Sequence, residues 1–284
     1  MRLLLACIFL SLGCCQAFLS LQAQVAGTTR FSGNALCTMS QESDYSECED
    51  GDGECEAYEN AKKSLWVGDG GMEEIFKRNR EWVRMVGRSD PDMFDRLKNA
   101  QAPTYLYIGC SDSRVPAQNM LGLTTGELFV HRNIANLCIN NDLSLLSVLT
   151  YAVEVLKVSD IIVCGHTRCG GIKASMENTD HGLLEHWLHH IRNVRRAHAE
   201  ELNAISDPDA RWDRLVDLNV QEQCLNLFAN PIVQKRQAID ALPRIHGWVY
   251  DISTGLVKEV KVDFRSEIKK YRDIYRLYDF PKGE

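Results

Sequence analysis

The segment TYLYIGCSDSRVPA, residues 104–117, contains an apolar run followed directly by a polar loop, and this order indicates the fold class. Its first five residues are a short apolar run of β-forming side chains that begins directly after Pro103. The loop that follows concentrates three reactive side chains, Cys110, Asp112 and Arg114. This succession predicts a buried strand with a polar loop at its carboxyl end.

Two similar apolar runs follow, ELFVH at residues 127–131 and DIIVC at residues 160–164. Between them, residues 143–156 place apolar side chains at helical spacing, namely Leu145, Leu146, Leu149, Ala152, Val153 and Leu156. Continuous apolar strands that alternate with helices are typical of a parallel sheet covered on both faces. The sequence therefore predicts an α/β fold with a mainly parallel β-sheet.

The rest of the pattern completes one domain over residues 65–284. Helical periodicity is found at residues 73–86, 183–200, 211–228, 231–240 and 266–278, and Gly87 is expected to end the first of these helices. Residues 245–251 and 256–262 flank Ser253-Thr254-Gly255, a hairpin signal that predicts an antiparallel edge strand. No repeat or internal linker interrupts this part, so we expect a single domain with flanking helices.

The overall composition is that of a globular protein. The 284 residues are 45% hydrophobic and 25% charged, which excludes a disordered or fibrous chain. The net charge of −7 argues against a nucleic-acid partner. Much of this charge lies in residues 37–64, because residues 37–59 hold nine acidic side chains and no Lys or Arg. We interpret residues 37–64 as an acidic, disordered spacer.

The N-terminus has the pattern of a targeting sequence. In residues 1–17, Arg2 precedes the apolar run Leu3–Leu12, and Ala17 is the expected cleavage point of a signal peptide. Residues 18–36 form a transit-like segment, because the Ser-, Thr- and Arg-containing stretch 18–33 has no acidic residue. This order is similar to the two-part presequence of algae with secondary plastids, so we expect a plastid (chloroplast) location, with secretion as the alternative. No stretch is long enough to span a bilayer after processing.

A second reactive loop, GHTRCGG at residues 165–171, directly follows the third strand. Functional sites of open parallel sheets form beyond the carboxyl ends of the strands, so Cys110, His166 and Cys169 can converge there. Two thiolates and an imidazole suit Zn²⁺, with one tetrahedral position left open for catalysis.

Other interpretations of these residues are weaker. The thiols could be buried apolar side chains, as we expect for Cys164 within its strand, and the glycines simple turn residues. A closed structural zinc site lacks a fourth Cys or His, a redox pair lacks a C-x-x-C motif, and a Cys/His hydrolase would leave Cys169 without a role. The histidines near residues 181–198 are expected on an ordinary charged helix face.

The two loops, together with GELFVHRNIAN at residues 126–136 and YAV at residues 151–153, closely resemble the signatures of the β-class carbonic anhydrases. The resemblance covers about residues 70–265. It implies reversible hydration of carbon dioxide to bicarbonate and a proton, serving inorganic carbon supply, with one Zn²⁺ per chain. The implied zinc ligands are Cys110, His166 and Cys169, and Asp112 with Arg114 is the implied catalytic pair. It also implies an N-terminal helical arm, here residues 73–86, and a homodimer or higher homo-oligomer such as a tetramer.

By the same resemblance, two further groups of residues are assigned. The substrate pocket would contain Gln101, Phe129, Ile134, Tyr151 and Gly170. A bicarbonate regulatory site found in a subset of the family would use Tyr107, Gly109 and Arg132, with Tyr107 replacing the usual Trp. In that subset Asp112 would become a fourth metal ligand in a closed state. Thr150 stands where the family usually has Glu or Gln.

Two other functions remain open from the sequence. A related zinc enzyme could hydrolyse CS₂ or COS, which the entrance to the pocket would decide. A non-catalytic protein could hold zinc and sense bicarbonate, although such a protein has no need of Asp112 and Arg114. The proton shuttle residue, the role of Arg168 and a disulfide between Cys48 and Cys55 are also left undecided by the sequence.

Overall fold

The computed structural model describes residues 71–280 of the chain. The signal peptide predicted at 1–17, the transit-like segment at 18–36, the acidic spacer at 37–64 and the first residues of the domain lie outside this range. The chain divides into two units, Met1–Phe76 and Lys77–Glu284. Of the first unit only residues 71–76, the start of helix α3, are described.

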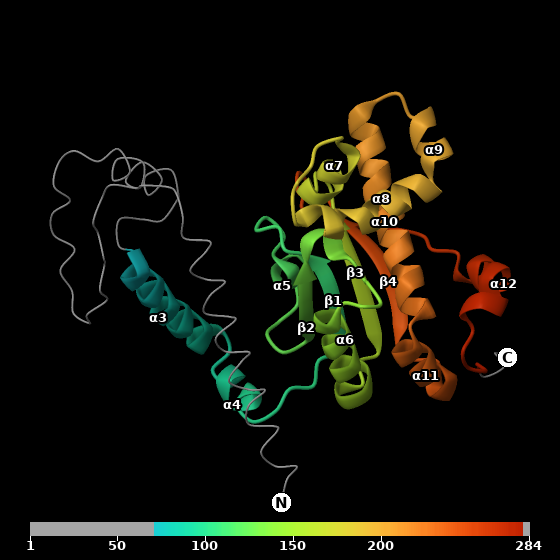
Figure 1. Cartoon of the computed structure of the whole chain (residues 1–284). Helices are drawn as coiled ribbons and strands as arrows, with labels where there is room; N and C mark the ends of the chain where they lie inside the picture. The colour runs from blue at the N-terminus through green and yellow to red at the C-terminus, as the bar shows by residue number, and fades with distance from the viewer. Residues whose placement is uncertain (1–70, 281–284) are drawn as a thin grey trace, which may run out of the picture. The chain divides into compact units, whose positions relative to one another are not determined.

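The described part contains a five-stranded sheet with the strand order β2-β1-β3-β4-β5 (Figure 1). Its strands are β1 (Tyr105–Cys110), β2 (Leu128–Asn133), β3 (Asp160–His166), β4 (Arg244–Tyr250) and β5 (Val257–Glu259). The first four are parallel, and β5 pairs antiparallel with β4 at the edge. The predicted α/β fold, with its parallel sheet and antiparallel edge strand, is confirmed.

Each predicted helical segment is found, with differences at its limits, and the structure adds short helices, such as Met93–Leu97 and Ala117–Met120, that the sequence analysis did not predict. They are α3 (Gly71–Ser89), α4 (Met93–Leu97), α5 (Ala117–Met120), η1 (Ile134–Asn136), α6 (Leu143–Thr150), η2 (Tyr151–Leu156), α7 (Gly170–Met176), α8 (Leu184–Ala197), α9 (Ala199–Ala204), α10 (Pro208–Ala229), α11 (Pro231–Asp240) and α12 (Phe264–Tyr275). The expectation that Gly87 ends the first helix was wrong, because α3 continues to Ser89. A glycine within a helix costs only about 1 kcal/mol, which its helix-forming neighbours offset.

Two other predicted helices are each divided in the structure. The segment 143–156 begins as α6 and continues as the π-helix η2, and the segment near 183–200 is interrupted at His198 between α8 and α9. Among residues 71–280, no helix combines the length and the apolar character that crossing a membrane requires.

The core lies on both faces of the sheet. Because side chains alternate along a strand, Leu106, Ile108 and Cys110 of β1 join a large cluster with residues of α6, α8 and α10. Tyr107 points to the opposite face, into a smaller cluster with Ala117 at the start of α5. Figure 1 shows α5 on one side of the sheet and α10 on the other. This double burial explains the continuous apolar runs of β1 and β3.

Helix α10 is the longest described helix, and its start is encoded locally. The side chain of Asp207 accepts a hydrogen bond from the backbone N–H of Asp209, and Pro208 occupies the first turn. The helix packs on β3 and β4. Its buried residues are Leu215, Val216, Leu218, Asn219, Val220, Gln223, Cys224 and Leu227.

A charged cluster of Asp160, Arg244 and His246 joins the amino-terminal ends of β3 and β4 through hydrogen bonds. The Asp160 carboxylate accepts hydrogen bonds from Arg244 Nε at 2.7 Å and Nη2 at 2.9 Å, and lies 2.8 Å from His246 Nε2. Asp160 is almost fully buried, whereas Arg244 is largely exposed. The Arg244 guanidinium holds the pKa of this carboxyl well below its usual range.

We expect Asp160→Asn to lower the free energy of unfolding by about 2 kcal/mol at neutral pH, since it removes the charged acceptor. The folded-state pKa of Asp160 lies below its unfolded value, so its contribution is present above that unfolded value, about 3.9, and is lost as the pH falls further. Denaturant titrations at several pH values should therefore show the two proteins converging in acid. An equal difference at pH 7 and pH 2 would contradict this account.

Candidate metal centre

Three metal-binding side chains meet at the carboxyl ends of neighbouring strands. Cys110 is the last residue of β1, His166 is the last residue of β3, and Cys169 immediately precedes α7. β1 and β3 are paired in parallel, so the two strand ends lie side by side. The three donor atoms lie within 4.8 Å of one another, and all three residues are buried. This is the one Cys/His/carboxylate group of metal-binding geometry found among residues 71–280.

The geometry of these donors fits a tetrahedral zinc ion. Cys110 Sγ and Cys169 Sγ lie 3.9 Å apart. Two Zn–S bonds of about 2.3 Å at the tetrahedral angle would place the sulfurs about 3.8 Å apart. His166 Nδ1 lies 2.9 Å from the Thr167 carbonyl oxygen, which can only accept, so Nδ1 carries the proton. His166 Nε2 is buried without a hydrogen-bond partner in the described structure, as a metal-binding lone pair would be.

The pKa of the Cys110 thiol shifts in the opposite direction from that of the buried thiols Cys138, Cys164 and Cys224. The contact between the two sulfurs lowers the pKa of Cys110 and raises the pKa of Cys169, so the pair shares one proton. Burial instead raises the thiol pKa of Cys138, Cys164 and Cys224. A cation that binds both sulfurs of the cluster takes the place of the proton they share. Cys164 lies within β3, as the sequence predicts for an inert core thiol.

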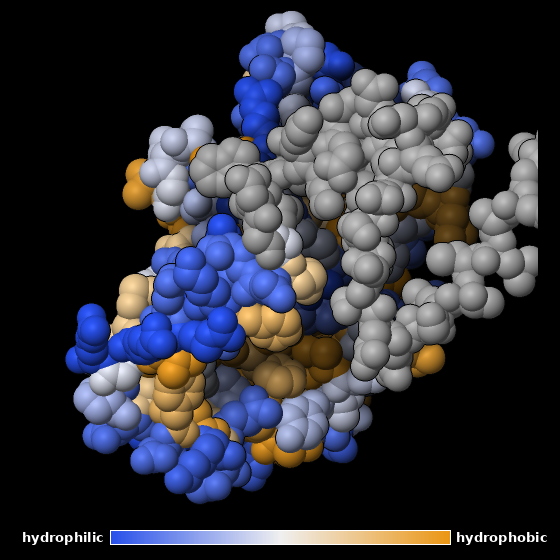
Figure 2. Space-filling model, turned by 90° about the vertical axis from the view of Figure 1, so that its left-hand side faces the viewer, coloured by the Kyte–Doolittle hydropathy of each residue, from blue (hydrophilic) through white to orange (hydrophobic). Residues whose placement is uncertain are grey.

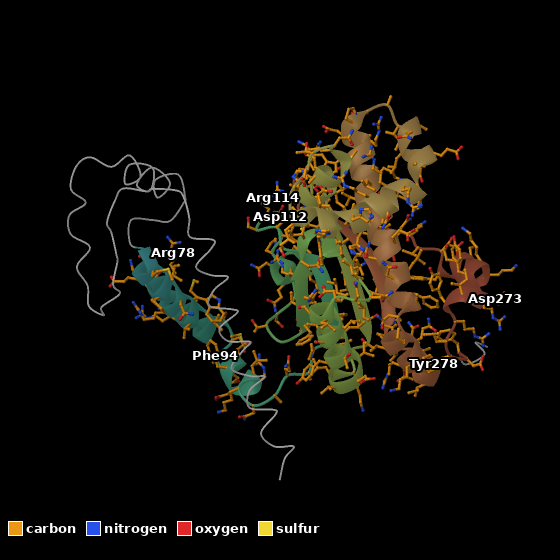
Figure 3. All side chains as sticks on the ribbon, viewed as in Figure 1. Arg78, Phe94, Asp112, Arg114, Asp273 and Tyr278 are labelled. Carbon is orange, nitrogen blue, oxygen red and sulfur yellow. The ribbon has the colours of Figure 1, made fainter. Side chains whose placement is uncertain are left out.

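Asp112 and Arg114 form a two-pronged ion pair beside the metal-binding cluster, and Figure 3 shows them next to each other. Arg114 Nε donates to Asp112 Oδ1 at 2.9 Å, and Arg114 Nη2 donates to Oδ2 at 2.7 Å. These bonds hold the pKa of the Asp112 carboxyl well below its usual range. Asp112 Oδ2 lies 3.8 Å from His166 Nε2. The structure therefore shows the arrangement in which Asp112 is paired with Arg114.

Arg168, whose role the sequence left undecided, lies in the loop between His166 and Cys169. Its guanidinium pairs with Asp209 at 2.8 Å and lies 5.2 Å from the ring centroid of Trp212. Its carbonyl oxygen accepts a hydrogen bond from Arg114 Nη2 at 3.3 Å. Arg168 thus joins the second metal-binding loop to α10 through its side chain and to the first loop through its backbone.

The three residues of the expected regulatory site are neighbours in the structure. Gly109 of β1 pairs with Arg132 of β2. Tyr107 is fully buried, and its ring lies so close to Gly109 that a Cβ there would meet a ring carbon at 2.2 Å. The Arg132 guanidinium donates to the carbonyl oxygens of Cys110 at 2.9 Å and Asp112 at 2.7 Å. Arg132 therefore stabilises the backbone of the first metal-binding loop through two hydrogen bonds.

The residues assigned to the substrate pocket are only partly together. The rings of Phe129 and Tyr151 are paired, with centroids 5.8 Å apart. Ile134 contacts Gly171, where a Cβ would meet its Cγ2 at 2.8 Å, whereas a Cβ on Gly170 would meet nothing within 4 Å. Close packing therefore requires glycine at 171 and not at 170. Gln101 is exposed in the segment between α4 and β1.

Two residues of α10 that contact the backbone near the metal-binding cluster were missed by the sequence analysis. Trp212 Nε1 donates to the carbonyl oxygen of Cys169 at 3.1 Å. Asn219 Nδ2 donates to the carbonyl oxygen of Ala135 at 3.0 Å. The signal for Asn219 was present in the sequence, because Asn219 and Gln223 are polar residues four apart within an apolar helical stripe.

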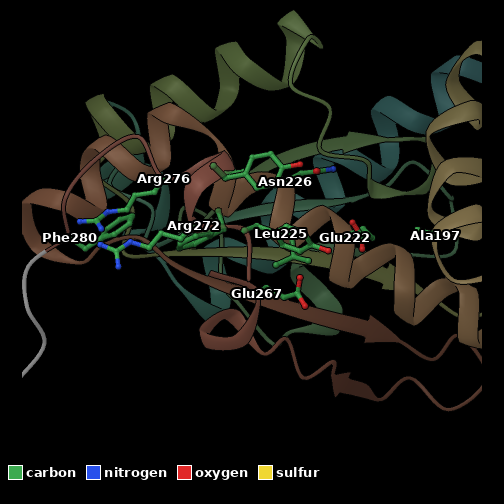
Figure 4. Close-up of a pocket in the computed structure, with 12 residues that line it drawn as sticks. Ala197, Glu222, Leu225, Asn226, Glu267, Arg272, Arg276 and Phe280 are labelled. Carbon is green, nitrogen blue, oxygen red and sulfur yellow. The ribbon is translucent and has the colours of Figure 1, made fainter. Parts of the chain in front are cut away.

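A separate cavity of about 280 Å³ lies between α10 and α12 (Figure 4). Its lining includes Glu222, Leu225, Tyr271, Arg272 and Phe280, and none of the metal-binding residues. The histidines of α8 likewise belong to no metal-binding group in the part of the chain that is described.

Comparison with known proteins gives a consistent result. A family model described as "Carbonic anhydrase" matches residues 105–257. The chain is 47% identical over 211 residues to a carbonic anhydrase of Emericella nidulans, covering 74% of this chain and 91% of that protein. It is 35% identical over 214 residues to a carbonic anhydrase of Candida albicans, covering 73% of each.

Solved structures agree with these matches. The β-carbonic anhydrase of Coccomyxa in complex with acetazolamide is similar with a TM-score of 0.65 and 40% identity, over 68% of this chain and 87% of that one. A structure from a study of two tetrameric β-carbonic anhydrases of Sordaria macrospora is similar with a TM-score of 0.64 and 37% identity, over 68% of this chain and 98% of that one.

Proposed function

The chain belongs to the β-class carbonic anhydrases, and on this premise we propose that it hydrates carbon dioxide reversibly with a zinc ion held by Cys110, His166 and Cys169. The observation that carries the zinc proposal is the 3.9 Å separation of the two sulfurs, with the free Nε2 of His166 beside them. Three protein ligands leave one tetrahedral position open, which is the arrangement of a catalytic zinc site.

A zinc ion in this site would supply a nucleophile at neutral pH, since it lowers the pKa of a coordinated water toward neutrality, as is known for three-histidine carbonic anhydrases. In this proposal Asp112 accepts a hydrogen bond on the open side of the site; its support is that Asp112 Oδ2 lies 3.8 Å from His166 Nε2, the nitrogen that would bind the metal. Arg114 holds that carboxylate in its ionised form and in one orientation through two parallel hydrogen bonds.

Stopped-flow CO₂ hydration by the full-length protein, combined with its zinc content, tests this proposal. We expect one zinc per chain and activity that is lost on removal of the metal and restored by zinc. A protein with a full complement of zinc but no activity would instead favour a bicarbonate-sensing role. Activity toward CS₂ or COS but not CO₂ would favour the related hydrolase.

We further propose that the chain assembles into a homodimer or a larger homo-oligomer. No residue of α3 is buried, and six large apolar side chains of this helix are exposed: Met72, Ile75, Phe76, Trp82, Val83 and Met85. Leu143, Tyr151 and Val155 are also exposed. Figure 2 shows hydrophobic residues exposed among hydrophilic ones on one side of the molecule. Exposed apolar surface of this kind marks an association site.

Light scattering on the full-length protein is expected to give a molar mass of at least twice that of one chain. Phe76→Glu should lower the mass at a given concentration, because it places a charge on the apolar face of α3. Glu81→Lys, a charge reversal on the opposite face of the same helix, is the matched control. A monomer over the whole concentration range would contradict the oligomer.

For localisation we propose import into a plastid. The support is the sequence alone: an apolar signal in residues 1–17, followed by residues 18–33 with no acidic residue. Residues 1–60 fused to a fluorescent protein should direct it to the plastid of an alga with secondary plastids. A fusion that is secreted into the medium would support the alternative.

A further inference from the structure

The short helix η1 passes over the metal-binding cluster in an unusual backbone conformation. Ala135 has φ 62° and ψ 29°, and Asn136 has φ 51°, a left-handed region in which residues other than glycine are uncommon. Ala135 is fully buried, and its backbone N–H donates to Cys110 Sγ at 3.4 Å. A strained conformation of this kind persists only where the surrounding structure enforces it.

Buried amides of α10 form a hydrogen-bonded chain that holds Ala135 in place. Asn219 Nδ2 donates to the Ala135 carbonyl oxygen at 3.0 Å, and Gln223 Nε2 donates to Asn219 Oδ1 at 3.1 Å. Gln223 Oε1 accepts the backbone N–H of Cys138 at 2.8 Å. Asn219 is 1% exposed and Gln223 is 2% exposed, and Gln223 Oε1 also accepts a hydrogen bond from Asn226 Nδ2 at 3.2 Å.

The two ends of this chain fix the orientation of both amides. The Cys138 N–H can only donate, so the Gln223 oxygen must face it and the Gln223 amide nitrogen must face Asn219. The Asn219 oxygen then faces Gln223, and its nitrogen faces the Ala135 carbonyl, which can only accept. Each group therefore donates to the next: the Cys138 N–H to Gln223, Gln223 to Asn219, and Asn219 to the Ala135 carbonyl oxygen.

The same face of α10 also contacts the other metal-binding loop. Trp212, two turns before Asn219, donates to the carbonyl oxygen of Cys169. Between these two residues, Val216 and Val220 pack against Gly165, where a Cβ would meet a Val220 methyl at 2.7 Å. One face of α10 therefore contacts the backbone at Cys169, at Gly165 next to His166, and at Ala135, whose N–H donates to Cys110 Sγ.

We propose that Asn219, oriented by Gln223, is a positioning residue that holds the Ala135 N–H against Cys110 Sγ. This rests on the proposed function in one respect only, that the cluster binds a metal. Asn219 contacts neither the metal-binding atoms nor the substrate. Its effect passes through Ala135, whose N–H offsets part of the negative charge on the Cys110 thiolate and fixes the sulfur in place.

Substituting Co²⁺ into the full-length protein gives a readout that is independent of turnover. Asn219→Leu keeps the branched shape of the side chain but removes the hydrogen bond to Ala135. We expect its thiolate-to-Co²⁺ absorption band to move to lower energy, because the sulfur becomes richer in electrons. We also expect Co²⁺ affinity, measured by competition with a chelator, to fall about tenfold. Gln223→Met, which leaves Asn219 in place but frees its orientation, should give a smaller change in the same direction.

Leu227→Ala is the matched control, because Leu227 is a buried residue of α10 without a hydrogen bond to the metal-binding loops. It should destabilise the fold and leave the band and the affinity unchanged. If Asn219→Leu does not fold, Gln223→Met decides the question alone. Three results would overturn the proposal. The first is a folded Asn219→Leu or Gln223→Met variant with the wild-type band and affinity. The others are the same shift in Leu227→Ala, and a wild-type protein without a thiolate-to-Co²⁺ band. A wild-type protein that shows these Co²⁺ effects but does not hydrate CO₂ would contradict the proposed function alone.

Discussion

Cys169→Ser is expected to lose both its metal and its activity in CO₂ hydration. The serine hydroxyl stays protonated at neutral pH, so it cannot replace a thiolate as a metal ligand. Replacing a residue that only supports a ligand costs about 10- to 100-fold in metal affinity. Replacing the ligand itself should cost more than about a hundredfold.

The measurement is zinc per chain after dialysis, together with stopped-flow activity on the same sample. The loop should keep its shape in this variant, because Trp212 bonds to the backbone carbonyl of residue 169 and not to its side chain. Cys224→Ser is the matched control, since Cys224 is a buried thiol outside the cluster whose pKa is raised by burial. It should keep one zinc per chain. A Cys169→Ser protein with a full complement of zinc would show that this sulfur does not hold the metal.

The convergence of the three donors could be predicted from the sequence because it follows from topology. Residues 105–108 and 161–164 form continuous apolar runs, which indicates strands buried on both faces, and such strands end at the same edge of a parallel sheet. Cys110 and His166 occupy those ends, so their separation of 56 positions along the chain did not conceal their proximity in space.

The support from α10 could not be predicted in the same way. Helical periodicity shows which side chains of α10 face the core, but not which backbone groups they meet there. The contact of Asn219 with Ala135 joins residues 84 positions apart. Ala135 itself gives no sequence signal, because a left-handed conformation is normally expected at glycine. Gly170 and Gly171 look equivalent in sequence, and only the packing of Ile134 distinguishes them.

Asp112→Asn is expected to reduce CO₂ hydration by about a hundredfold or more while the zinc content stays at one per chain. Asparagine has nearly the same shape but no charge, so Arg114 loses its ionic partner and no longer fixes the orientation of the side chain. The amide can also turn its nitrogen toward the open side of the site, where it would donate a hydrogen bond that the reaction requires to be accepted. Activity and zinc content measured on one preparation separate this effect from loss of metal.

Arg114→Lys distinguishes the charge of the pair from its geometry. Lysine keeps the positive charge but offers a single ammonium group, so it cannot form the two parallel hydrogen bonds that Arg114 makes through Nε and Nη2. It also loses the bond from Nη2 to the Arg168 carbonyl, which joins the two metal-binding loops. We therefore expect activity between those of the wild type and Asp112→Asn, with zinc retained. If Arg114→Lys were fully active, charge alone would suffice. If Asp112→Asn were fully active, the pair would not take part in catalysis, although it lies beside the metal-binding cluster.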